Sequence, residues 1–190
     1  MNETLINEAE SFIRKLFEDN ADGHDCEHTL RVYRNSLQIA EKEKCDPEIL
    51  ALTALLHDVD DHKLFNTENN ENARSFLKQH NIPDETIEII CNNINSISFS
   101  KNRGKKPKTI EGQIVQDADR LDALGAIGIA RPFAYGGSRK RPLTSSIDHF
   151  HEKLLLLKDE MNTAEGKRLA EERHGYMIEF LKRFAEETQS

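Results

Sequence analysis

The sequence predicts an all-α fold, and three observations lead to that prediction. Apolar residues recur at spacings of three and four along most of the chain, which is the helical period. No segment of useful length alternates with the period of a strand, and no internal repeat is found. Helix-start and helix-stop signals separate the periodic segments. We therefore expect one all-α domain over residues 1–190, a length that can bury one full core.

The first two helices are expected before residue 45. Apolar side chains at helical spacing predict an amphipathic helix over residues 3–19, which Asn20-Ala21-Asp22-Gly23 would end. A second stripe, which includes Leu30 and Leu37, predicts a helix from about residue 25 to residue 44.

A third helix is expected to lie in the middle of the domain. Asp46 is a good N-cap and Pro47 suits a first turn, so the helix begins here. The apolar run from Leu50 to Leu56 then leads directly into His57 and Asp58. The helix is therefore expected to be buried and to end in an imidazole and a carboxylate.

The later segments are also expected to be helical. Breakers and basic residues mark two loops, at residues 101–108 and 136–142, with the second expected to be mobile. Two long helices should close the chain after the part that carries the motifs, residues 20–140. The expected segments are residues 68–80, 84–94, 110–121 and 122–135, followed by about 145–161 and 164–187.

Composition excludes several classes of protein. The formal net charge of −8 disfavours binding to nucleic acid, so an anionic ligand would need a local basic patch. No apolar stretch approaches a membrane span and no signal peptide is recognised, so we expect a cytoplasmic protein that does not contact a membrane. The three cysteines are far apart and are expected to be reduced structural thiols, Cys26, Cys45 and Cys91.

Four side chains from three helices are candidate metal ligands. His28 lies beside the apolar stripe of its helix, and His57 and Asp58 end the next one. Alone, the last two could simply cap or salt-bridge a helix end. Asp119 lies on an apolar helix face, where its negative charge needs a partner such as a cation. Asp117 falls on another side of the helix and is expected to be solvated.

Two imidazoles and two carboxylates form a borderline-to-hard ligand set without a thiolate. That set favours a catalytic ion with open positions over a closed structural zinc site. We expect one divalent ion, with Mn²⁺ favoured, and Mg²⁺, Co²⁺, Ni²⁺, Fe²⁺ or Zn²⁺ would also fit.

The order His28, His57-Asp58, Asp119 resembles the signature of the HD-domain superfamily of metal-dependent phosphohydrolases. The neighbouring sequences Ala54-Leu55-Leu56-His57-Asp58 and Asp117-Ala118-Asp119-Arg120-Leu121-Asp122 strengthen the resemblance, which is greatest to small single-domain bacterial members. It implies a helical bundle with the ion held between helices. Larger dinuclear members add two histidines after the HD pair, where this chain offers His62 and His80, so one ion is favoured.

The resemblance also implies a catalytic base. Asp61 follows Asp58 by three residues and is expected to align the attacking water, although it could equally be a solvated acid at a helix end. Asp60 is expected to be exposed. Lys63 is expected to stabilise charge that develops on the phosphate, and Arg31 to bind phosphate or support an acidic residue.

The basic loop at residues 101–108 could attract a polyanion, or it could be a solvated loop. Lys101, Arg103 and Lys105 are the expected substrate contacts there, and residues 139–141 form a second basic cluster. We expect a phosphohydrolase acting on nucleotides or related small phosphate esters; release of pyrophosphate from nucleoside triphosphates is one reaction that this expectation includes. The alternative is a non-catalytic sensor of metal and nucleotide on the same scaffold. The chain could act as a monomer or a homodimer.

Overall fold

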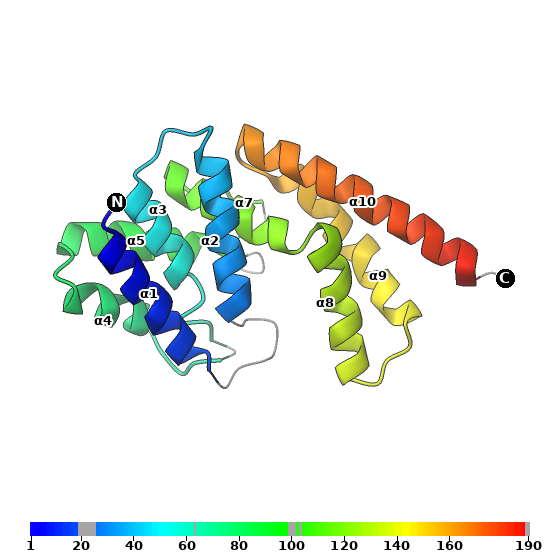
Figure 1. The fold of residues 1–190 in the computed structure, drawn as a ribbon, viewed down its shortest axis with the longest axis horizontal. Coiled ribbons are helices and arrows are strands. Elements are labelled where there is room, and N and C mark those ends of the chain that lie inside the picture. Colours follow the sequence, from blue (N-terminus) through cyan, green and yellow to red (C-terminus); the bar gives the residue numbers. More distant parts are fainter. Residues whose placement is uncertain (19–25, 63, 99–101, 103, 189–190) are drawn as a thin grey trace. The chain divides into compact units, whose positions relative to one another are not determined.

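The computed structural model describes residues 1–18, 26–62, 64–98, 102 and 104–188 (Figure 1). These residues form helices and contain no strand, so the all-α prediction is confirmed. The α-helices are α1 (Glu3–Leu16), α2 (Cys26–Ala40), α3 (Pro47–Leu56), α4 (Glu71–Gln79), α5 (Asp84–Ile97), α7 (Ile110–Asp122), α8 (Gly125–Ser138), α9 (Thr144–Glu152) and α10 (Ala164–Thr188), and η1 (Leu154–Glu160) is a 3-10 helix. None of the described helices is both long and apolar enough to traverse a lipid bilayer.

The chain divides into two compact units, Met1–Ala118 and Asp119–Ser190. In the first unit, α3 contacts α1, α2 and α5, and α4 contacts α5 (Figure 1). In the second unit, α10 contacts α8 and η1, while α9 contacts α8 and η1. Helix α7 continues without a break across the boundary between the units. That residues 1–190 form a single domain stays a prediction.

Helix α3 is the buried centre of the first unit. Its side chains from Leu50 to Leu56 are all inaccessible to solvent. Asp46 caps the helix because its Oδ1 accepts hydrogen bonds from the backbone N–H groups of Glu48 (2.9 Å) and Ile49 (3.1 Å). The predicted N-cap and the predicted burial are both confirmed, so the position of His57 follows from an apolar helix with a fixed beginning.

The second unit has its own aromatic core. Phe133 of α8 lies 6.1 Å from Phe150 of α9 and 5.9 Å from Phe180 and Phe184 of α10, measured between ring centroids. Phe150 is fully buried. Aromatic pairs at these separations stabilise a core beyond the area that they bury.

Two expectations about the second unit are wrong. The helix expected over about residues 145–161 is divided at Lys153 into α9 and η1. The leucine run explains the change: Leu154 and Leu157 are both buried, and residues three apart lie above one another in a 3-10 helix.

The basic loop expected from Gly136 begins later, because residues 136–138 form the last turn of α8. Gly136 is buried, and a Cβ atom there would lie 2.9 Å from Oγ of Ser146 in α9. The glycine therefore allows close packing of two helices where the sequence indicated a turn.

Candidate metal centre

The HD turn, residues 57–61, begins where α3 ends. His57 is the C-cap of α3, and its Nδ1 lies 2.8 Å from the carbonyl oxygen of Ala54. Since a carbonyl oxygen only accepts, Nδ1 donates a proton to it, which leaves Nε2 as the ring nitrogen that could bind a cation. This Nε2 is buried and has no hydrogen-bond partner. A nitrogen oriented and left unsatisfied in this way is suited to a cation.

Asp58 places a carboxylate oxygen between two imidazoles. Its Oδ2 lies 3.4 Å from Nε2 of His57 and 3.4 Å from Nε2 of His28, which comes from α2. All three residues are buried. A carboxylate oxygen this close to two imidazole nitrogens suits a shared divalent ion, which would attract all three atoms.

Asp119, on α7, brings a second carboxylate to the same group. One ligand atom each from His28, His57 and Asp119 lie within 4.8 Å of one another, and the three could hold a metal ion. Within the described part of the chain, this is the one group of three or more such side chains. The residues fit a divalent ion; that His28, His57, Asp58 and Asp119 are the ligands stays a prediction.

Asp60 has a role that the sequence did not reveal. It is half-buried rather than exposed, and its carboxylate accepts hydrogen bonds from the backbone N–H groups of Asn72 (2.9 Å) and Ala73 (3.0 Å). These groups belong to the first turn of α4, whose own N-cap residue, Asn70, makes no side-chain cap. The Nδ2 of Asn72 in turn donates to the carbonyl oxygen of Val59 (2.7 Å). The HD turn and the start of α4 therefore hold one another.

Asp61 lies one turn beyond Asp58, as expected. Its backbone N–H donates to the carbonyl oxygen of Asp58 (3.0 Å), and its side chain is only 17% exposed, with Oδ1 3.8 Å from Nδ1 of His62. Its role as a base stays a prediction.

The expected phosphate contacts are only partly described. Arg31 lies on α2, three residues after His28, and is half-buried; Lys105 is exposed. Lys63, Lys101 and Arg103 lie outside the described residues. The substrate contacts therefore remain predictions.

Asp117 was expected to be solvated, and this is wrong. It is fully buried, as are its neighbours Gln116 and Ala118. A single apolar stripe underestimates the burial of α7, because residues 114–118 are buried around the helix rather than along one face. Polar residues on such a helix give no sequence signal of their burial.

Comparisons with known proteins identify a family and a close relative in sequence. The family model described as the HD domain matches residues 26–124. The protein YpgQ of Bacillus subtilis is 40% identical over 181 residues, which cover 90% of this chain and 88% of YpgQ.

Solved structures extend the likeness to the whole chain. The crystal structure of B. subtilis YpgQ in complex with ADP superposes with a TM-score of 0.84 at 33% identity and covers 97% of this chain and 95% of that one. An HD-superfamily hydrolase from Bacillus thuringiensis superposes with a TM-score of 0.83 at 37% identity, with both chains fully covered. The chain therefore belongs to the HD-domain family and has the fold of the HD-superfamily hydrolases.

Proposed function

We propose that this protein is a divalent-metal-dependent phosphohydrolase that acts on nucleotides or related small phosphate esters. One observation carries the proposal: the buried, unsatisfied Nε2 of His57 belongs to a group of two imidazoles and two carboxylates. The crystal structure of YpgQ with ADP supports a nucleotide as the ligand. A divalent ion held by these side chains would activate water as a nucleophile and polarise a phosphoryl oxygen.

The neighbouring residues suggest how the chain would assist the reaction. The carboxylate of Asp61 would align the attacking water and accept its proton, and its limited exposure suits that role. Arg31 and Lys63 would bind phosphate oxygens and stabilise the charge that develops on them. With a nucleoside triphosphate, water would form a bond to the α-phosphorus, and the bond to the bridging oxygen would break to release pyrophosphate.

One ion is favoured over two. His80 is the C-cap of α4, its Nδ1 lies 2.7 Å from the carbonyl oxygen of Phe76, and its Nε2 lies 3.2 Å from Oε2 of Glu8. Both ring nitrogens therefore have partners that suit a helix end. The side chain of His62 is 60% exposed. Neither histidine supports a second ion.

A screen of products tests the proposal. Nucleoside mono-, di- and triphosphates would be incubated with Mn²⁺, Mg²⁺, Co²⁺ or Ni²⁺, and orthophosphate and pyrophosphate would be measured separately. We expect turnover that depends on the metal, with Mn²⁺ the most effective. Nucleotide binding without any product would favour the sensor, and binding of neither metal nor nucleotide would contradict the proposal.

A variant of the proposed base separates catalysis from metal binding. Asp61→Asn keeps the size of the side chain and removes its charge. Turnover should fall by about 100-fold or more, which is the size of a general-base contribution, while metal content stays unchanged. Loss of metal in this variant would instead make Asp61 a ligand.

A further inference from the structure

The α7 end, residues 119–122, carries Asp119 in the last turn of its helix. Carbonyl groups in such a turn lack partners within the helix and are satisfied by the residues that follow it or by other elements. The carbonyl oxygen of Leu121 accepts a hydrogen bond from the backbone N–H of Leu124, at 3.1 Å, and a shorter one from Nη1 of Arg173, at 2.6 Å. Arg173 belongs to α10 and follows Leu121 by 52 residues. A guanidinium therefore fixes the backbone two residues after the proposed ligand.

Arg173 reaches this carbonyl group at an energetic cost. It is half-buried, and burial lowers the pKa of its guanidinium below the usual value, while Asp122 acts against that change. Burying a charge is unfavourable unless it has partners. The hydrogen bond to Leu121 and the carboxylate of Asp122 supply them within the second unit.

Gly125 provides the space that the Arg173 side chain occupies. A Cβ atom at this position would lie 3.1 Å from Cγ, 3.3 Å from Cβ and 3.4 Å from Cδ of Arg173. Gly125 also has a φ of +70°, a conformation that side chains with a Cβ atom rarely adopt. A glycine is therefore required here for the backbone and for the arginine stem together.

The two other residues of the α7 end are held to different elements. Arg120 is buried and contacts the carbonyl oxygen of Glu160 in η1, with Nη2 3.3 Å from Oε2 of the same residue. The carboxylate of Asp122 is 2% exposed and accepts a hydrogen bond from Nη1 of Arg131 in α8, at 2.9 Å. Arg120, Leu121 and Asp122 thus each contact a different element, and Arg173 supplies the side-chain contact to the backbone.

We propose that Arg173 is a positioning residue that holds the carboxylate of Asp119 in the orientation needed to bind the metal ion. The inference deepens the proposed function and rests on the assignment of Asp119 as a ligand. Preorganised ligands bind without losing further conformational freedom, and removal of a group that orients a ligand weakens metal binding by about 10- to 100-fold. Gly125 contributes by leaving room for the arginine.

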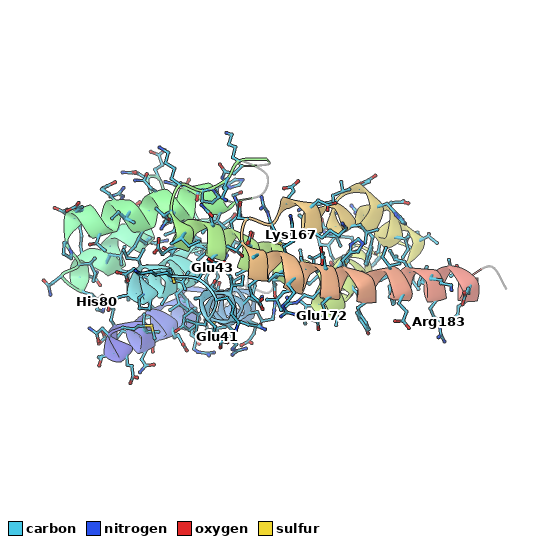
Figure 2. All side chains as sticks on the ribbon, turned by 90° about the horizontal axis from the view of Figure 1, so that it is seen from above. Glu41, Glu43, His80, Lys167, Glu172 and Arg183 are labelled. Carbon is cyan, nitrogen blue, oxygen red and sulfur yellow. The ribbon has the colours of Figure 1, made fainter. Side chains whose placement is uncertain are left out.

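Metal binding without substrate gives a direct test. Mn²⁺ affinity would be measured by electron paramagnetic resonance and calorimetry for the wild type, Arg173→Met, Arg173→Lys and Arg183→Met. Arg183 lies on the same helix with an exposed side chain (Figure 2), so its variant is a matched control. We expect Arg173→Met to lose about tenfold or more in affinity, Arg173→Lys to recover part of it, and Arg183→Met to match the wild type.

Activity at high metal concentration separates positioning from general damage. If Arg173 acts through the metal, the Mn²⁺ concentration for half-maximal activity rises in Arg173→Met, whereas kcat at saturating Mn²⁺ stays near that of the wild type. Gly125→Ala should reproduce the loss of affinity by displacing the same side chain. Should Arg173→Met not fold, Arg173→Lys and Gly125→Ala, monitored by thermal unfolding of the metal-free protein, carry the test.

The outcomes distinguish the two proposals. A wild type that binds no metal contradicts the proposed function itself. A wild type that binds metal, together with Arg173 and Gly125 variants of equal affinity, overturns the positioning role and leaves the function intact. An equal loss of affinity in Arg183→Met would also overturn it.

Discussion

The HD turn and the α7 end each carry a carboxylate proposed as a metal ligand, but they are held in different ways. In the HD turn, His57 bonds to Ala54 three residues earlier, and Asp60 bonds to the start of α4. In the α7 end, each of the three contacts involves a guanidinium group, and the partners lie 9, 40 and 52 residues away. The HD turn is ordered by bonds from its side chains to backbone groups, whereas the α7 end is ordered mainly by guanidinium groups, two of which connect it to η1 and α10.

This difference determines how each segment can fail. Loss of a helix cap costs about 0.5–2 kcal/mol, because water replaces part of the lost bond. Removing one partner of a buried ion pair costs about 3–5 kcal/mol, since the remaining charge is left buried. The α7 end is therefore expected to be more sensitive to single substitutions than the HD turn.

The largest effect should come from removing either carboxylate itself. Asp58→Ala, in the HD turn, and Asp119→Ala, in the α7 end, should each abolish both metal binding and turnover, because each removes a proposed ligand. Metal content and product formation would be measured on the same samples. If one variant kept its metal, the two segments would not contribute to one site.

The buried thiol of Cys91 tests the first unit alone. The pKa of Cys91 is raised to about 11, chiefly by burial; Arg74 acts against this change, and Glu88 and Asp60 add to it. Because the folded state holds this proton more tightly than the unfolded state, its stabilising effect is complete below pH 9 and is lost as the pH rises through about 11.

The expected loss of unfolding free energy by pH 11 is about 2 kcal/mol. Urea denaturation of the wild type and of Cys91→Ala, from pH 8 to pH 11, would measure it as the difference between two curves. If the unfolding free energies of the two proteins changed with pH in parallel, the thiol would not contribute to the pH dependence of stability. No effect of this kind is expected from the α7 end, which contains no cysteine.

A smaller effect is expected when the HD turn loses its contact with α4. Asp60→Ala should lower the unfolding free energy by about 1–2 kcal/mol and weaken Mn²⁺ binding, because the turn that carries Asp58 is no longer fixed. Asp46→Ala is the matched control, since Asp46 caps α3 through the same two kinds of bond at the opposite end of that helix. The control should lose similar stability and keep its affinity. Equal affinity in both variants would show that the Asp60 contact supports only the fold.

The smallest effect concerns the basic loop, which belongs to neither segment. Replacing the exposed residues Lys105 and Lys106 with Gln should raise KM for a triphosphate by about a few-fold at low salt and leave kcat unchanged. The effect is small because water and salt screen exposed charges. Steady-state kinetics at two salt concentrations would measure this. An unchanged KM at low salt would remove the loop from substrate binding.

The sequence by itself predicted the all-α fold, the cap at Asp46, the burial of α3 and the meeting of His28, His57 and Asp119. These features depend on helical period and on capping, which are encoded within a few neighbouring residues. The order of the ligands along the chain then indicated the family.

Only the tertiary structure showed the burial of Asp117, the contact between Asp60 and α4, and the hydrogen bond from Arg173 to Leu121. Asp60 and Asn72 are 12 residues apart, and Leu121 and Arg173 are 52 apart, so no local pattern links them. Such partners meet because packed helices bring their side chains together, and the packing depends on the whole core.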